Sequence, residues 1–505
     1  MTTLLQTMRR FLPAGIILLT AVLALLVAAL PWDQYGAPLL SFLVFGGAAL
    51  CFLVLDSSRE ERPFVLRLFF AALSVHLLAA VVYNAILRGP WLSDALSYDR
   101  VGAVLAGFGG QNLPTEQALG PLAWIAGDLF PRFVGFIYSV IGRSPYAIVA
   151  MNIALGACSV YLIYRIASII LGPATARWAG WMAVFYSGFW IFSLMMLKDA
   201  LGAFLLLLFF YYLYRLWNRL LLPAPWWQRF GISFALLALL AGTLLVAGEV
   251  REYIKPALLA SAASLILVWF ARFRVRWQTL GILAIMVVAA ILLWPNIADY
   301  RLGRVNLEPD SGLGQVVQIP PTDTIGSLAG WALRNPIPFG KYMLLAAGST
   351  AIAPFAWILP VGNPDSPPFT PYTVAAPGMW LWYACIPFCA LGIISAWRRS
   401  KGEILPLLLL AAGLFLVFSL IIPRESRHRD IILPILLIFS AEGVVYCRNY
   451  WMLGLFFWVP LSLFMAWKIQ ALDIYALAVT AAAAILVGWF FLLRGRGGKI
   501  HWRGG

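Results

Sequence analysis

The residues of this chain that are best able to do chemistry stand where apolar stretches end. One such segment, 91–100, holds Asp94 and, one helical turn later, Tyr98, followed by Asp99. At that spacing a helix presents Asp94 and Tyr98 on one face, so a carboxylate and a phenol could converge on one site. The alternative is an ordinary solvated loop in which Asp94 caps a helix.

Basic residues occupy three further junctions between apolar stretches. Lys198 and Asp199 lie between two such stretches with almost no loop, and Arg251 and Lys255 flank the start of another. A charge buried in or beside a membrane is costly and is usually functional. The alternative is that Lys198 and Asp199 only cap a tight helical hairpin. The third junction carries four potential cations, Arg424, Arg427, His428 and Arg429.

The composition identifies the elements that must position these residues. Of 505 residues, 62% are hydrophobic and only 11% are charged, less than half the charged share of a soluble domain. Stretches of about 20 apolar residues cross a bilayer as helices, whereas an outer-membrane barrel would show alternation. We therefore predict an all-α polytopic membrane protein with about 14 transmembrane helices. The predicted spans are 13–30, 38–55, 64–87, 145–164, 176–195, 200–217, 231–248, 256–271, 278–295, 378–396, 404–422, 431–447, 451–467 and 474–493.

The distribution of charge predicts the orientation of these spans. With both termini cytoplasmic, nearly all of the net charge of +15 falls in cytoplasmic loops, as the positive-inside bias requires. That bias, rather than nucleic acid binding, accounts for the basic composition. All four junctions described above then lie on the extracytoplasmic side, where there is no positive excess. Cations held there favour an anionic ligand, and a phosphate fits Arg and Lys best. The alternative is a patch for anionic lipid headgroups.

The same topology predicts four regions. Residues 1–60 form an N-terminal transmembrane hairpin, and 61–295 form a membrane core with a long extracytoplasmic loop, 88–145. Weakly amphipathic stretches at 98–105 and 119–138 suit interfacial helices in that loop. Residues 296–377 form a second extracytoplasmic region, in which 342–360 contains Pro354 and Pro360 and reads as a re-entrant segment. Residues 378–505 form the C-terminal spans and a basic cytoplasmic tail.

The chain carries no nucleotide, zinc-protease or α/β-hydrolase motif. Cys385 and Cys389 are one helical turn apart but have no nearby His or acidic residue, so we predict no metal site there. The sequence specifies no cofactor and leaves open whether a divalent metal assists. His76 lies in mid-span, where we expect a packed or hydrogen-bonded core residue rather than a proton relay.

The junction residues resemble the GT-C superfamily of integral membrane glycosyltransferases, in particular bacterial relatives of the dolichyl-phosphate-mannose-protein mannosyltransferase and aminoarabinose transferase type. The segment from Asp94 to Tyr98 is similar to the acidic D-x-x-x-Y stretch of that family's first long outer loop. Lys198 and Asp199 are similar to the basic and acidic pair at its next outer turn, and the stretch 427–429 before a span is similar to its late Arg-rich segment. Two departures are Ser93 in place of a second acid and the extra hairpin at 13–55.

This resemblance implies a plasma (inner) membrane enzyme that moves a sugar from a polyprenyl phosphate to an extracytoplasmic glycan, lipid or protein. Asp94 would act as the base on the acceptor hydroxyl, and the anomeric carbon would be inverted. The cations that would stabilise the departing phosphate are Lys198, Arg251, Arg427 and Arg429. The expected partners are therefore the lipid-linked sugar, its acceptor and membrane lipids, and not nucleic acid.

Two other functions remain open from the residues. An O-antigen-type polymerase or ligase also uses an outer Arg-rich site, but with a diphosphate donor. A secondary transporter or lipid flippase fits the number of spans, although transporters usually place charges near the bilayer midplane and show internal repeats.

Overall fold

The computed structural model describes residues 36–86, 91–108, 128–221, 226–251, 254–272, 325–340, 371–400, 402–420 and 431–446, and the regular secondary structure of these residues is helical. Five of the helices are long and apolar enough to cross a membrane. They are α2 (Ala37–Asp56), α3 (Arg62–Val81), α7 (Pro145–Leu171), α10 (Lys198–Leu221) and α11 (Trp226–Val250). The protein is therefore a multi-pass helical membrane protein.

These five helices coincide with the predicted spans 38–55, 64–87, 145–164, 200–217 and 231–248, and their length and composition suit a membrane crossing. Four other predicted spans are helical in the structure, as α12 (Ile254–Arg272), α16 (Pro371–Ser400), α17 (Leu405–Leu420) and α19 (Leu433–Tyr446). The predicted spans 13–30, 278–295, 451–467 and 474–493 lie outside the described residues, as does the re-entrant segment 342–360. Within 296–377 the structure describes α14 (Ile325–Arg334) and the start of α16.

The predicted span 176–195 is not one helix. It is divided into α8 (Pro173–Phe185) and α9 (Ser187–Leu194), because Tyr186 has an extended backbone. The indole Nε1 of Trp190 donates a hydrogen bond of 3.1 Å to the carbonyl of Val184, beside the interruption. A second interruption, after Leu194, separates α9 from α10.

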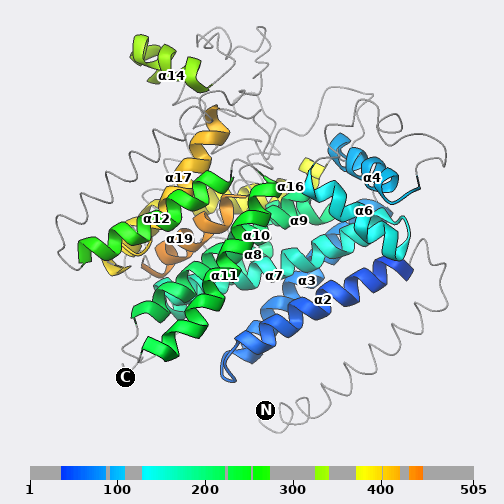
Figure 1. The fold of residues 1–505 in the computed structure, drawn as a ribbon, viewed down its shortest axis with the longest axis horizontal. Coiled ribbons are helices and arrows are strands. Elements are labelled where there is room, and N and C mark those ends of the chain that lie inside the picture. Colours follow the sequence, from blue (N-terminus) through cyan, green and yellow to red (C-terminus); the bar gives the residue numbers. More distant parts are fainter. Residues whose placement is uncertain are drawn as a thin grey trace, which may run out of the picture.

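Helix α7 forms the centre of the bundle, with α2 and α3 on one side and α8 and α10 on the other (Figure 1). It is the most buried of the five candidate spans, and α2 is the least buried. Small residues such as Ala147, Ala154 and Gly156 line α7, and small residues let membrane helices approach closely. The side chains of α7 are therefore well placed to hold α2, α3, α8 and α10 in position.

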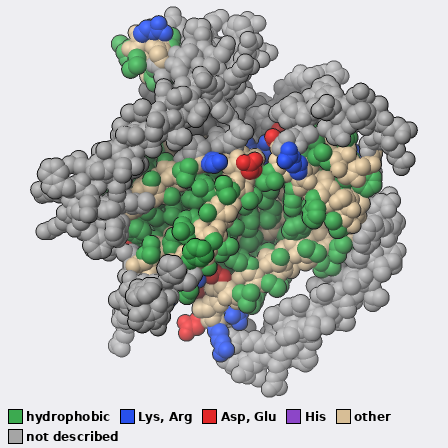
Figure 2. All heavy atoms as spheres, viewed as in Figure 1, with side chains coloured by type: hydrophobic (Ala, Val, Ile, Leu, Met, Phe, Trp, Pro, Cys, Tyr) green, Lys and Arg blue, Asp and Glu red, His purple; other side chains and the backbone are tan. Residues whose placement is uncertain are grey.

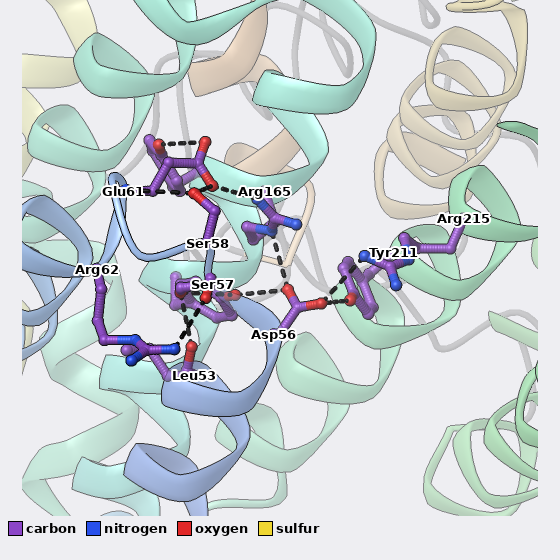
Figure 3. Close-up of polar contacts among 11 residues, drawn as sticks. Leu53, Asp56, Ser57, Ser58, Glu61, Arg62, Arg165, Tyr211 and Arg215 are labelled. Carbon is purple, nitrogen blue, oxygen red and sulfur yellow. Dashed lines mark hydrogen bonds and ion pairs between the residues drawn. The ribbon is translucent and has the colours of Figure 1, made fainter.

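The charged side chains that Figure 2 shows on the main helical bundle lie at two levels, with an apolar belt between them, and a further basic group lies on α14. One level is the turn after α2, where the Asp56 carboxylate accepts hydrogen bonds from two phenols and two guanidinium groups (Figure 3). The donors are Tyr161 at 2.5 Å, Arg165 at 2.9 Å, Arg215 at 3.1 Å, and Tyr211. Because these donors belong to α7 and α10, Asp56 ties the end of α2 to both helices. The other level contains the junctions that the sequence predicts to be functional.

Within this Asp56 cluster, the effect of a substitution should depend on how buried the donor is. Tyr211 is buried, so we expect Tyr211→Phe to lower the free energy of unfolding by about 1.5–3 kcal/mol, the usual value of a hydrogen bond to a charged group. Arg215 has a side chain that is 44% exposed, so Arg215→Ala should cost at most about 1 kcal/mol. Thermal unfolding of the two purified variants in detergent checks this difference, and a larger loss for Arg215→Ala would contradict it.

Candidate active site

Two short helices follow α3 at the second charged level. Helix α4 (Ser93–Leu105) overlaps the predicted amphipathic stretch 98–105, and α6 (Leu129–Ile141) overlaps the end of the stretch 119–138. Their backbones are in close contact at two glycines. A Cβ on Gly102 would lie 2.4 Å from a Val134 methyl carbon, and a Cβ on Gly135 would lie 2.9 Å from the Leu105 Cβ. The two helices therefore form one packed unit.

The Asp99 carboxylate joins α4 to α6 and to the residues after it. It accepts hydrogen bonds from the Tyr138 hydroxyl at 2.8 Å and from Arg143 Nη2 at 2.5 Å. Burial and the neighbouring Asp99 raise the pKa of the Tyr138 phenol well above its ordinary value. The hydrogen bond with Asp99 also raises the pKa of Arg143, which stays charged. Asp99 is thus engaged within the protein, and its predicted contact with substrate stays a prediction.

Asp94 is the second residue of α4 and is half-buried, while Ala95 and Tyr98 beside it are buried. The position before the helix is occupied by Leu92, so Asp94 lies in the first turn and does not take the capping position. A carboxylate there is favoured by the positive end of the helix dipole. The Leu92 amide lies 3.5 Å from the Met195 sulfur, which brings the start of α4 next to the segment that leads to Lys198.

Lys198 is the first residue of α10 and faces α4. Its Nζ lies 5.8 Å from the centre of the Tyr98 ring, within the range of a cation–π contact, and 3.4 Å from Asp128 Oδ2. The Tyr98 ring in turn packs edge-on against Phe130, with 5.1 Å between the ring centres. The Lys198 ammonium group therefore contacts both α4 and the residue that directly precedes α6.

Asp199, the next residue, forms an ion pair with Arg251, directly after α11. The side chains are 2% and 7% exposed, so this pair is buried, unlike the pair between Lys198 and Asp128. Lys255 lies on α12 and is exposed, and its aliphatic stem covers Gly248, where a Cβ would lie 2.9 Å from the Lys255 Cδ. The pair between Asp199 and Arg251 anchors the first turn of α10.

The structure thus places several predicted site residues at one end of the bundle. Tyr98 meets Lys198, and Asp199 meets Arg251, while Asp94 stands in the first turn of the same α4. The cluster of Arg424, Arg427, His428 and Arg429 lies outside the described residues. Among the residues that are described, no three His, Cys, Asp or Glu side chains are grouped so that they could hold a metal ion.

Sequence reasoning missed three residues of this region, which are Asp128, Tyr138 and Arg143. Asp128 directly precedes the strongly amphipathic helix α6, which is the usual place for an acidic capping residue. The place of Asp128 directly before an amphipathic stretch is therefore a local feature by which the sequence marks this residue. The pairing of Asp99 with Tyr138 and Arg143 spans about 40 residues and has no local signal.

No protein-family model matches this chain, and no curated protein matches it. Among solved structures, the chain is similar to the archaeal oligosaccharyltransferase AglB from Archaeoglobus fulgidus, in complex with an inhibitory peptide and a dolichol-phosphate. The sequence identity is 12% and the TM-score is 0.44. The match covers 85% of this chain and 55% of that chain, so this chain spans about half the length of the other. A likeness of this degree carries no inference about chemistry.

Proposed function

We propose that the protein is a membrane glycosyltransferase that moves a sugar from a polyprenyl-phosphate donor to an extracytoplasmic acceptor with inversion. The observation that carries the proposal is the contact between Lys198 and Tyr98. It places a cation at the end of a transmembrane helix against the short helix whose first turn holds Asp94. A carboxylate and a cation that are about 100 residues apart in the chain therefore belong to one end of the bundle.

The proposed reaction needs these two kinds of group. The bond between the anomeric carbon and the phosphate oxygen breaks, and its electron pair leaves with the phosphate. The acceptor oxygen forms the new bond from the opposite face of the sugar, and its proton passes to the Asp94 carboxylate. A phosphate is a good leaving group that needs positive charge more than a proton, so Lys198 can stabilise it as charge develops. One carboxylate is enough, in contrast to glycoside hydrolysis, which uses two.

The two ion pairs differ in burial, and we therefore assign Lys198 and Arg251 different roles. The pair between Lys198 and Asp128 has a long separation of 3.4 Å, and its side chains are 22% and 37% exposed. Such a pair contributes little to stability, so Lys198 can exchange Asp128 for a phosphate at low cost. The buried pair between Arg251 and Asp199 is costly to open. Arg251 therefore acts mainly by holding the first turn of α10, and so Lys198, in place.

The position of Lys198 also suits a lipid-linked substrate. It stands where the apolar span α10 begins, so a phosphate bound there lies at the membrane surface. The polyprenyl chain of the donor can then stay in the bilayer beside the apolar helices. A water-soluble nucleotide sugar has no need for such a location.

Reconstituted protein tests this function. We expect proteoliposomes to transfer a radiolabelled sugar from a polyprenyl monophosphate to acceptors extracted from the cell envelope, and Lys198→Ala to abolish most of the transfer. Donors that carry a hexose and donors that carry a pentose should be tested in turn. Transfer only from the corresponding diphosphate would support a polymerase or ligase instead. Movement of intact donor across the bilayer without cleavage would support a flippase, and either result would overturn the proposal.

A further inference from the structure

The backbone between α9 and α10 is irregular although it is fully buried. Met195 is extended, with φ −151° and ψ 178°, and α10 does not begin until Lys198. Met195, Met196 and Leu197 have no exposed surface. In a membrane protein, carbonyl groups that lose their helical partners need hydrogen bonds from within the protein.

Two asparagine side chains supply these hydrogen bonds. Asn152, on α7, is completely buried, and its Nδ2 lies 3.1 Å from the carbonyl oxygen of Phe192, 3.2 Å from that of Met195 and 3.1 Å from that of Leu197. Asn84, in the π-helical turn η2 (Val82–Ile86), places its Nδ2 2.7 Å from the carbonyl oxygen of Leu194. The Asn152 side chain therefore bonds to residues before and within the irregular segment 195–197. The Asn84 side chain bonds to Leu194, directly before that segment.

Asn84 also connects the interruption to the helix that carries Asp94. Its Oδ1 accepts a hydrogen bond of 2.9 Å from the indole of Trp91, which lies two residues before the start of α4. The same side chain thus contacts the segment before Lys198 through its nitrogen and the segment before Asp94 through its oxygen. A change at Asn84 should alter the relative position of the two segments.

A buried histidine completes the arrangement around Asn152. His76 Nδ1 lies 2.7 Å from Ser193 Oγ, which is 3.4 Å from the carbonyl oxygen of Asn152. Gly156, one turn after Asn152, makes room for the imidazole, because a Cβ there would lie 2.4 Å from His76 Cε1. His76 is thus a hydrogen-bonded core residue that locks α3, α7 and α9 around the interruption, as expected from the sequence.

We propose that Asn152 and Asn84 are positioning residues for Lys198. They fix the irregular segment 195–197, and this segment determines where α10 begins and holds the Lys198 ammonium over the Tyr98 ring. The importance of that position for catalysis rests on the proposed transferase function. The placement of Lys198 itself does not, and it can be measured without any activity.

The reactivity of Lys198 in the full-length protein tests the proposal. A membrane-impermeant amine-acylating reagent is applied to proteoliposomes, and modification of Lys198 is quantified by mass spectrometry. We expect Asn152→Ala and Asn84→Ala each to raise the rate of modification about fivefold, since buried carbonyls lose a hydrogen bond and the segment opens. Ser41→Ala is the matched control, because Ser41 also donates a buried hydrogen bond to α7, but to the carbonyl of Ala147 rather than to a carbonyl of the segment 192–197. In the Ser41→Ala variant, Lys198 should be modified at the same rate as in the wild type.

Unchanged modification of Lys198 in both asparagine variants would overturn the proposal. If Asn152→Ala does not yield folded protein, Asn84→Ala decides, because Asn84 is only half-buried and lies at a helix end. The two proposals fail separately. Altered Lys198 reactivity without any sugar transfer would refute only the transferase function, and loss of transfer in Lys198→Ala with unchanged reactivity in the asparagine variants would refute only this one.

Discussion

Asp94→Asn is expected to reduce the turnover of sugar transfer about 10²–10⁴-fold, the usual contribution of a general base. The amide cannot accept the proton of the acceptor hydroxyl, although it has the size and shape of the carboxylate. Protein stability should change little, because loss of a negative charge in the first turn of a helix costs at most about 1 kcal/mol. The measurement compares initial rates at saturating donor for wild-type and variant protein, together with their thermal unfolding.

Glu249→Gln is the matched control for Asp94→Asn. Glu249 is an exposed acid close to the end of α11 on the same side of the bundle, so its neutralisation should leave the rate of transfer unchanged. Turnover of Asp94→Asn close to that of the wild type would show that another group accepts the proton. Equal losses in the two variants would point to a general effect of surface charge.

The second large effect is expected at the buried ion pair between Asp199 and Arg251. Removing one partner leaves an uncompensated charge in a place where the side chains are 2% and 7% exposed. We therefore expect Asp199→Leu or Arg251→Met alone to lower the free energy of unfolding by about 3–5 kcal/mol. Denaturation of the purified variants in detergent measures this loss.

The double variant tests whether the loss of stability comes from the charge that is left unpaired. Replacing both charges by apolar residues of similar volume should restore most of the stability, because no unpaired charge remains. The pair between Arg143 and Asp99 is a useful comparison, since Arg143 is 49% exposed and Arg143→Met should cost at most about 1 kcal/mol. Single variants at Asp199 and Arg251 that unfold like the wild type would contradict the account of this pair.

Much of the fold could be predicted because apolar length alone determines which segments can span a bilayer. Helices α2, α3, α7, α10 and α11 follow from their runs of apolar residues. The segment between α9 and α10 coincides with the break between the predicted spans 176–195 and 200–217, but the contacts that hold its irregular backbone could not be predicted in the same way. This backbone is stabilised by Asn152 and Asn84, which lie about 40 and 110 residues away in the chain. Local hydropathy contains no information about such partners.

The candidate site was predictable to a similar degree. The spacing of Asp94 and Tyr98 and the position of Lys198 beside an apolar span are local features, and the structure has Tyr98 and Lys198 in contact. The partners of the charged residues are not local features. Asp128 pairs with Lys198 across about 70 residues, and Arg251 pairs with Asp199 across about 50. The sequence therefore indicates where the candidate site lies better than it indicates which of its cations could bind a ligand.

A structure of the protein with a polyprenyl phosphate bound tests the central claim most directly. The account predicts that a phosphate oxygen lies about 3 Å from the Lys198 Nζ, in the place that Asp128 Oδ2 now occupies, with Asp94 facing the space where the sugar would be. A phosphate bound away from Lys198, with Asp94 directed away from the lipid headgroup, would contradict it.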